Sequence, residues 1–506
     1  MIIIPFTKFK ISRLSGNVFL IITFFSLDKV LAFVRAGIIS RQYRDSVELL
    51  DTFNAANNLP DALFALISAG ALSMAFIPLL TEYLTQKDRS AAWDLFSRVA
   101  NLAFLVTGGM AVVIAIFAQP IADRVIVPGF PLDQRILLAE LMRLNLISTI
   151  IFSISGLVSA SLQANQHFLS PALAPIAYNV GQILGALFLV PYYGIQGLVY
   201  GVILGALFHL LIQIPALIKF GFRWTPALEL RHTGLVEALR LLWPRLLTMG
   251  AIQLPMILRD NFASQLGQEG AVTALTNGWM LMQVPETIIG TAIATAMLPT
   301  LAELAARQDW VEFRDTIERA LRVLIVLMLP AATVMAAGLH PWVQVVFGFD
   351  EAQSVLITWT TRAYLLTLTG YAIQEVATRT FYARKLPLYP LVTVVLRVVL
   401  YAVIGLSAVR FFRQMGAPVI AFADIALFAE SLVLFWLLIR QIQKPLRVWD
   451  AILRGLVAAL VGGAAAYGLA VFLPGPGYIT ALAGMVAGAV IAIVIVWKDA
   501  RLVFRL

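Results

Sequence analysis

The sequence predicts an all-α polytopic membrane protein with fourteen transmembrane helices, arranged as two parallel six-helix lobes plus two appended helices. Three observations lead to this prediction. Long apolar runs recur from end to end, only 13% of the residues are charged while 60% are hydrophobic, and two pairs of segments repeat at nearly one spacing. A soluble protein keeps about a quarter of its residues charged. The apolar runs are too long for the strands of a membrane β-barrel and do not alternate as those strands do.

Windows of about 20 residues, the length of helix that crosses the hydrocarbon core of a bilayer, place the predicted helices along the chain. They lie at residues 17–39, 52–83, 93–119, 136–162, 168–190, 194–219, 237–266, 270–303, 316–338, 353–383, 388–408, 417–441, 449–473 and 478–497. The N-terminal stretch MIIIPFTKFKISRLSG has no small-residue cleavage site after a short apolar core. We therefore expect a retained interfacial segment and not a signal peptide.

The charges of the loops predict the orientation in the membrane. If the N-terminus is inside, the inner loops and tails hold about 19 Lys and Arg residues and the outer loops about 6. Because cytoplasmic loops collect Lys and Arg, both termini are predicted to be cytoplasmic. The net charge is +9, and the Lys and Arg residues lie mostly at helix ends, as they do in other membrane proteins. We therefore expect no nucleic-acid partner. The chain has no Cys, which excludes disulfides and thiolate metal sites.

Two pairs of segments indicate an internal repeat. AFIPLLTEYLTQKD at 75–88 matches AMLPTLAELAARQD at 296–309, with Asp88 on Asp309. A second pair, LQANQHFLSP and FYARKLPLYP, repeats at an offset two residues shorter, which a loop deletion explains. Six helices separate the members of each pair. An even number preserves orientation, so the halves are predicted to be parallel repeats related by an axis along the membrane normal.

The repeat predicts a domain plan. It consists of an N-lobe at 1–219, a cytoplasmic interlobe linker at 220–236, a C-lobe at 237–441, and the appended helices 13 and 14 with the C-terminal tail at 442–506. Two-lobed transporters bind their substrate between the lobes and alternate by rocking. The stretch GGAAAYG in the first appended helix offers small residues for close packing or for a lipid-tail groove, and close packing is the simpler interpretation.

Ionisable residues lie inside the predicted spans, where they are costly and usually face a polar cavity or pair with one another. The first span carries Asp28, Lys29 and Arg35, and the seventh carries Arg259 and Asp260. Asp28 and Arg35 are seven residues apart on one helical face, so a structural pair is one interpretation. Arg259 and Asp260 are adjacent, so their side chains should diverge and Arg259 should point into a cavity. Unpaired cations in a cavity favour an anionic substrate such as a phosphate.

Three further arginines of the predicted spans have a simpler interpretation. The long side chains of Arg143, Arg362 and Arg397 are each expected to extend to a membrane interface.

Enzyme signatures are absent from the sequence. There is no Walker A, HExxH or GxSxG stretch, and the four His are scattered. We expect no enzymatic activity, no catalytic residue, no metal site and no cofactor, and the identity of any coupling ion stays open. Transport would run on an ion gradient, the membrane potential or the substrate gradient.

The runs DKVLAFVRAGIISRQY and LLDTFNAANNLPDALFALISAGALSMAFIPLLTEY resemble the first two helices of the MurJ/MviN family of lipid II flippases. The family pattern there is approximately SRVLGFxRD and TDAFxxAFxxPNxxRxxxAEGAxxxAFxPxxxEY. ILRDNFAS, GAVTAL, QVPETIIGTAIATAMLPTLAEL and TRTFYARK also resemble family segments. The resemblance covers essentially the whole chain. It implies the fourteen-helix fold of the multidrug/oligosaccharidyl-lipid/polysaccharide exporter superfamily.

The resemblance implies a cationic central cavity that holds the diphosphate and sugar of a lipid-linked precursor. The two arginines of the family's first helix fall on Lys29 and Arg35, and the outer-end Asp falls on Asp51. Arg259 is expected to restore one cation from a neighbouring helix. The candidate substrate-binding residues are Lys29, Arg35, Arg259, Asp51, Asn57 and Asp61.

The chain departs from the family pattern at several cavity positions. The cavity arginine of helix 2 falls on Phe64, the Glu of the AEGA stretch on Ser68, the helix-8 arginine on Met280, and the acid after the second helix-1 arginine on Ala36. Two cavity cations are therefore absent, and Lys29 replaces a third. These differences leave open another polyprenyl-phosphate-linked glycan that carries less charge.

The resemblance implies a flippase for a polyprenyl-diphosphate-linked glycan, the peptidoglycan precursor lipid II. It would move this lipid from the inner to the outer leaflet of the bacterial inner membrane by alternating access, in peptidoglycan biosynthesis, cell-wall biogenesis and the maintenance of cell shape. The expected partners are the lipid-linked oligosaccharide and membrane lipids, and the expected oligomeric state is a monomer.

Two other functions stay open. A multidrug or cation antiporter of the same superfamily would favour carboxylates and aromatics in its cavity, and the cations of helix 1 count against it. A non-transporting scaffold for envelope synthesis, with a decayed cavity, is kept open by Phe64 and Met280.

Overall fold

The computed structural model is helical throughout most of the residues that it describes, and no strand occurs among them. The described residues are 13–66, 71–86, 88–228, 233–384, 386, 388–442 and 446–502. The all-α prediction is thereby confirmed. Residues 1–12, Ser68, part of the predicted linker and several of the inner-loop cations lie outside the described residues.

Helical segments occupy all fourteen predicted ranges. The first seven ranges hold α1 (Arg13–Gln42), α2 (Val47–Phe64), α3 (Ala71–Gln86), α4 (Arg89–Ile116), α6 (Leu132–Ala164), α7 (Leu169–Leu184), η3 (Gly185–Leu189), α9 (Gln196–Leu211), α10 (Ile214–Lys219) and α11 (Thr233–Ser264). The other seven hold α12 (Ala271–Pro285), η4 (Glu286–Thr291), α13 (Ala292–Ala306), α14 (Trp310–Phe347), α15 (Glu351–Leu365), α16 (Leu368–Ala383), α17 (Leu388–Phe411), α18 (Ala417–Phe422), α19 (Ile425–Ile442), α20 (Trp449–Phe472) and α21 (Gly477–Ala500).

Short elements complete the described chain. They are α5 (Ala118–Ile121), η2 (Ala122–Ile126), α8 (Val190–Tyr193) and η5 (Arg413–Met415). Among the described residues, 10 helical segments are long and apolar enough to cross a membrane. The chain is therefore a multi-pass membrane protein.

Several predicted spans are interrupted, which the apolar pattern alone did not reveal. The span at 270–303 contains the π-turn η4, which begins directly after Pro285. Proline lacks a backbone N–H and clashes with the preceding turn, so the ladder of helical hydrogen bonds shifts there. The span at 353–383 breaks at Leu366 and Thr367 between α15 and α16. Such breaks free backbone and side-chain polar groups inside a membrane protein.

The chain divides by packing into two units. Unit 1 comprises Met1–Ile39, Ala56–Ile121 and Leu137–Gly250. Unit 2 comprises Ser40–Ala55, Ala122–Ile136 and Ala251–Leu506. Some helices change unit along their length, so these units do not coincide with the lobes proposed from the repeat. The repeat boundaries remain a prediction about sequence equivalence.

The repeated segments share a local structural feature. Asp88 is the N-cap of α4, and its side chain accepts a hydrogen bond from the Ala91 amide at 2.7 Å. Its repeat partner Asp309 is the N-cap of α14, and its side chain accepts from the Glu312 amide at 3.1 Å. A carboxylate at this position satisfies an amide that the first helical turn leaves free. The matched aspartates therefore begin matched helices.

The start of the predicted linker is docked on α4 within unit 1. The side-chain amide of Asn101 donates to the carbonyl oxygens of Thr225 at 2.9 Å and Ala227 at 3.0 Å. The ring of Phe222 contacts Trp93, with centroids 5.4 Å apart. This stretch therefore packs against the core of unit 1 through Phe222, while most of its other side chains are exposed.

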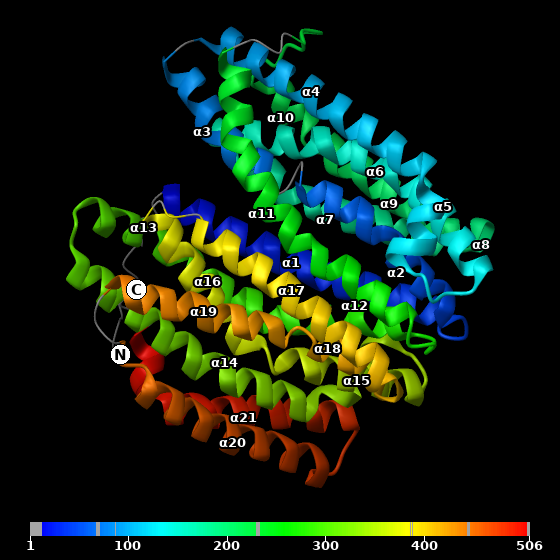
Figure 1. Ribbon diagram of the computed structural model, residues 1–506, viewed down its shortest axis with the longest axis vertical. Coiled ribbons are helices and arrows are strands. Elements are labelled where there is room, and N and C mark those ends of the chain that lie inside the picture. Colours follow the sequence, from blue (N-terminus) through cyan, green and yellow to red (C-terminus); the bar gives the residue numbers. More distant parts are fainter. Residues whose placement is uncertain are drawn as a thin grey trace, which may run out of the picture. The chain divides into compact units, whose positions relative to one another are not determined.

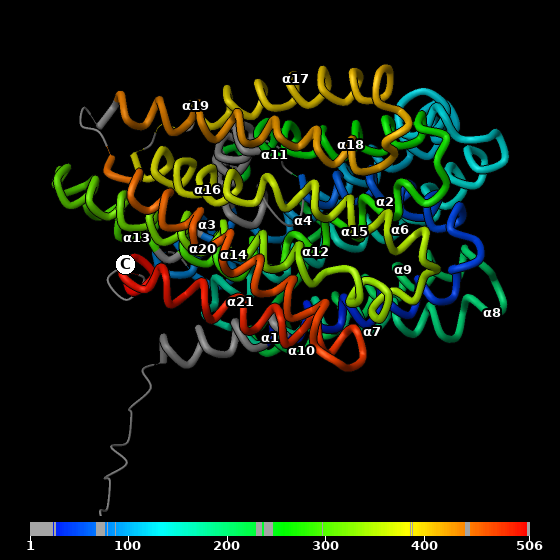
Figure 2. Tube along the Cα trace, turned by 90° about the horizontal axis from the view of Figure 1, so that it is seen from below, coloured from blue at the N-terminus to red at the C-terminus, as the bar shows by residue number. Residues whose placement is uncertain are grey.

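The two appended helices pack on α14 within unit 2, where Figures 1 and 2 show α20 and α21 beside it. Asp499 of α21 joins them, since its carboxylate accepts from the guanidinium of Arg322 on α14 at 2.8 Å and from Arg454 on α20 at 2.7 Å. Asp499 is buried, so removal of either arginine weakens its compensation.

Small residues bring α20 and α21 into close contact. A Cβ atom at Gly488 would lie 2.4 Å from the carbonyl oxygen of Gly462. In a membrane, where lipid is as apolar as the helices, such van der Waals contact is a principal source of helix association. The close-packing interpretation of GGAAAYG thus accounts for Gly462.

Gly488→Leu is expected to separate α20 from α21 and to destabilise the protein by about 1–3 kcal/mol, the usual cost of overpacking. Thermal unfolding of the purified protein in detergent measures this loss. Gly468→Leu is the matched control, because a Cβ atom there meets nothing within 4 Å. Equal melting temperatures for the two variants would contradict the close-contact explanation.

Candidate substrate-binding site

The charged residues of α1 lie on the part of the helix that belongs to unit 1. Asp28 is half-buried, and its carboxylate accepts a hydrogen bond from the side-chain amide of Asn179 on α7 at 2.7 Å. Asp28 therefore uses Asn179 as its hydrogen-bond partner, and the structural pair considered for Asp28 and Arg35 is not formed. The charges of Lys29 and Arg35 still act on it from the same helix.

The two cations of α1 remain accessible to a ligand. Lys29 is exposed and Arg35 is half-buried. Within the part of the chain that the structure describes, neither side chain makes a hydrogen bond or an ion pair. Arg35 interacts electrostatically with Asp61 on α2 and with Tyr178 on α7. A guanidinium that lies near these groups without an ion pair can donate two parallel hydrogen bonds to an anion.

Asn57 and Asp61 are the two candidates of α2 that belong to unit 1, and one packs while the other is accessible. The side-chain oxygen of Asn57 accepts from the amide of Asn145 on α6 at 2.7 Å, which joins the two helices. Asn145 is buried, and its side chain also accepts from Ser148 at 2.7 Å. Asp61 lies one turn after Asn57 and is exposed. Of these candidate residues, Asp61 is therefore the one that a ligand reaches.

An aromatic cluster occupies the region where the family pattern has its helix-2 cation. The ring of Phe64 lies 4.6 Å from that of Phe152 on α6, measured between centroids. Phe152 in turn contacts Tyr178 at 5.1 Å and the imidazole of His209 at 5.3 Å. His209 bonds to the hydroxyl of Ser155 through its Nδ1 atom at 2.6 Å. Packed rings thus surround the position at which the resemblance implies a cavity cation, and one of them is Tyr178, which lies near Arg35.

Asp51 has a structural partner in unit 2. Its side chain is 2% exposed and accepts from the backbone amide of Thr273 at 2.7 Å. Thr273 lies in the first turn of α12, which begins at Ala271. A carboxylate at a helix N-terminus satisfies a free amide and favours the positive end of the helix dipole. Asp51 therefore caps α12 from α2.

Arg259 is paired, contrary to the expectation that it diverges from Asp260. The Nε atom of Arg259 lies 2.8 Å from the Asp260 carboxylate, and its Nη2 atom donates to Thr276 at 3.3 Å. Both charged side chains are buried. Adjacent Cβ atoms do diverge on a helix, but the long stem of an arginine can curl back. Burial strengthens the attraction between the charges, so the expectation based on helix geometry was wrong.

Arg397 and Asp424 form a second buried ion pair in unit 2. Arg397 on α17 donates to Asp424 at 3.1 Å and to the hydroxyl of Tyr371 at 3.1 Å, and that hydroxyl donates to Asp424 at 2.7 Å. Arg397 is 7% exposed, so the expectation that it extends to an interface was wrong. Glu430 is buried nearby and interacts electrostatically with Arg397.

The other two arginines expected at an interface bond to backbone carbonyls. Arg143 is exposed, and its Nε atom donates to the Ala115 carbonyl at 3.0 Å. Arg362 is half-buried, its Nε atom donates to the Ala336 carbonyl at 3.0 Å, and its guanidinium lies 4.7 Å from the ring centroid of Trp359.

Two contributors to the site were missed at the level of sequence. Tyr178 lies near Arg35 and Asp61, and Phe152 contacts Phe64 and Tyr178. Tyr178 stands beside Asn179 in the otherwise apolar run PIAYNVG. Such a polar pair after a proline was a usable signal, whereas Phe152 sits in an ordinary apolar stretch and gave none.

Comparison with known proteins decides the family. The family described as "Lipid II flippase MurJ" matches residues 46–487. The chain belongs to this family of lipid II flippases. Lipid II flippase MurJ of Burkholderia cenocepacia is 28% identical over 377 residues, which are 71% of each chain. The probable lipid II flippase MurJ of Vibrio cholerae is 27% identical over 372 residues, 70% of each chain.

Solved structures agree with the fold. One of lipid II flippase MurJ in an inward closed conformation has a TM-score of 0.78 at 19% identity and covers 94% of this chain and 98% of that one. An inward-facing multidrug resistance transporter of the MATE family has a TM-score of 0.69 at 16% identity and covers 82% and 94%. The fold is common to both, while the family match favours the flippase over the antiporter.

Proposed function

We propose that this chain translocates lipid II, a polyprenyl-diphosphate-linked glycan, from the inner to the outer leaflet of the bacterial inner membrane by alternating access. The observation that carries the proposal is the family match over residues 46–487. The chain spans 71% of the length of the Burkholderia cenocepacia relative. The distribution of loop charges supports a cytoplasmic position for both termini.

Lys29 and Arg35 are assigned to the diphosphate. Both are available in unit 1, and Arg35 has the planar fork that fits phosphate oxygens. Asp61 is assigned two tasks. In the empty site its charge offsets part of the charge of Arg35, and in the loaded site its oxygens accept hydrogen bonds from sugar hydroxyls.

Three earlier candidates take structural roles in this proposal. Arg259 has its charge compensated by Asp260, Asp51 caps α12, and Asn57 joins α2 to α6. Removing any of them would disturb packing before it disturbed a ligand. The diphosphate is therefore assigned to fewer cations than the family pattern supplies.

The aromatic cluster favours a second candidate, another polyprenyl-phosphate-linked glycan with less charge. Phe64 is half-buried and offers a ring face on which a sugar can lie, in place of a cation, while Phe152 is buried against it. The same protein and the same assay distinguish the two substrates.

Reconstitution of the purified full-length chain into proteoliposomes tests the proposal. We expect it to move fluorescently labelled lipid II across the bilayer, and to support growth of cells depleted of their own lipid II flippase. Liposomes without protein are the control for spontaneous flipping. Movement of a different prenyl-linked glycan without lipid II would overturn the substrate, and movement of neither would overturn the function.

A further inference from the structure

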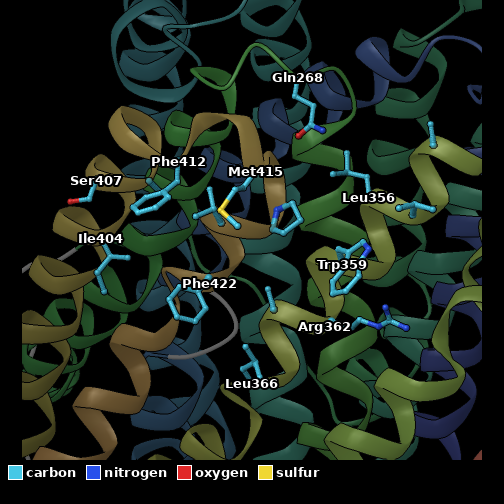
Figure 3. A pocket seen from close by; sticks show the side chains of 16 residues that line it. Gln268, Leu356, Trp359, Arg362, Leu366, Ile404, Ser407, Phe412, Met415 and Phe422 are labelled. Carbon is cyan, nitrogen blue, oxygen red and sulfur yellow. The ribbon is translucent and has the colours of Figure 1, made fainter. Parts of the chain in front are cut away.

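Unit 2 contains a groove of about 910 Å³ that the proposed function does not use. Its walls come from α15 on one side and from α17, the turn after it and α18 on the other. Figure 3 shows Leu356, Trp359 and Leu366 facing Ile404, Phe412 and Phe422, with Gln268 at one end. The volume is at the upper end of the range of about 300–1,000 Å³ typical of small-ligand sites.

The lining of the groove is mostly apolar, with Gln268, Arg362 and Ser407 as its polar members, and it is open to its surroundings. Trp359 is 55% exposed, Phe412 is 52% exposed and Met415 is 64% exposed. In a membrane protein, exposed apolar side chains face lipid chains, and a concave apolar surface holds a chain with more contacts than a flat one. The groove is thus shaped for a hydrocarbon chain.

A polar recess adjoins the groove at the Gln268 end. It has a volume of about 670 Å³ and shares Gln268, Ala352 and Leu356 with the groove as lining residues. The side-chain oxygen of Gln268 accepts from the Ala417 amide at 2.9 Å, which holds this junction against α18. A molecule with a polar head and an apolar tail would therefore fit across both.

The recess is acidic. Its ionisable side chains are Arg44, Asp45, Glu48, Glu269 and Asp350. Asp45 pairs with Arg44 at 3.3 Å, and Asp350 accepts from the Gln353 amide at 2.9 Å as the N-cap of α15. Within the described residues, the side chains of Glu48 and Glu269 make no hydrogen bond or ion pair. Two carboxylates are thus left for a cation.

We infer that the groove and the recess form one binding site for a membrane phospholipid with a protonated amine in its head group, such as phosphatidylethanolamine. The acyl chain lies in the groove, and the ammonium lies between Glu48 and Glu269. The phosphate replaces Asp45 as the partner of Arg44, because an exposed ion pair such as this one contributes little to stability. An anionic head group such as phosphatidylglycerol is disfavoured, because four carboxylates face one guanidinium.

Native mass spectrometry of the full-length protein, delipidated in detergent and titrated with each lipid, tests this inference. Phosphatidylethanolamine is expected to bind at least about fivefold more tightly than phosphatidylglycerol with the same acyl chains, since two exposed charge contacts are worth about 1 kcal/mol together. The double variant Glu48→Gln with Glu269→Gln is expected to remove this preference. Glu140→Gln, which neutralises an exposed carboxylate in unit 1, is expected to keep it.

The apolar half of the site has its own variant. Val355→Trp places an indole in the groove and is expected to weaken both lipids, whereas Leu406→Trp, at an exposed position that does not line the groove, is expected to weaken neither. Equal binding of the two lipids, preference for phosphatidylglycerol, or displacement of phosphatidylethanolamine by a polyprenyl phosphate would overturn the inference. Full binding by the Val355→Trp variant would overturn the placement of the chain. These outcomes are independent of whether lipid II is flipped.

Discussion

Arg35→Ala is expected to abolish translocation of lipid II while leaving insertion and folding nearly intact. Arg35 is the one guanidinium among the candidates of unit 1 that is accessible and makes no ion pair in the described structure. A hydrogen bond to a charged group contributes about 1.5–3 kcal/mol, so its loss weakens substrate binding about tenfold to a hundredfold. Labelled lipid II in proteoliposomes, and growth of flippase-depleted cells, measure the loss.

Conservative variants separate charge from geometry at this position. Arg35→Lys is expected to keep part of the activity, because the charge remains while the bidentate fork is lost. Lys29→Arg is expected to be tolerated or beneficial for a diphosphate. Arg143→Ala is the matched control and should transport normally, since among the described residues this exposed arginine bonds to a backbone carbonyl alone. Transport by Arg35→Ala at the level of the parent would show that the cationic mechanism is wrong.

Arg397→Ala is expected to destabilise the protein by about 3–5 kcal/mol, because it leaves a buried carboxylate without its cation. Asp424 is 3% exposed, and Glu430 beside it is fully buried. Arg397 forms the ion pair with Asp424 at 3.1 Å and also interacts electrostatically with Glu430. The melting temperature of the purified protein in detergent measures the effect. Loss of the monodisperse peak on size exclusion after heating is the second measurement.

The partner variant makes this prediction specific. Asp424→Asn is expected to cost less than Arg397→Ala, because Glu430 remains to compensate the arginine. The double variant Arg397→Met with Asp424→Leu is expected to recover much of the loss, since apolar residues of similar size often replace a buried pair without penalty. If Arg397→Ala were as stable as the parent, the pair would have no part in the stability of unit 2.

The sequence by itself determined the helical class, the approximate positions of the helical segments and the matched aspartates that begin the repeated helices. These features depend on local properties. A run of about 20 apolar residues is stable in lipid only as a helix, and an aspartate before a helix satisfies its free amides wherever that helix lies. For that reason Asp88 and Asp309, matched on sequence alone, both proved to be N-caps. The resemblance to the lipid II flippases rested on the same kind of local motif.

The tertiary structure alone decided which charges are compensated. The local sequence does not distinguish Arg35, Arg259 and Arg397, because each is an arginine in a predicted apolar helix. In the structure Arg259 and Arg397 are buried against carboxylates, whereas Arg35 is left without an ion pair in the described residues. The energy of a buried charge depends on the few groups within several ångströms, and its partner can be adjacent, as Asp260 is, or on another helix, as Asp424 is. Neither hydrophobic periodicity nor motif spacing contains those distances, so only the packing of the helices distinguishes a binding cation from a structural one.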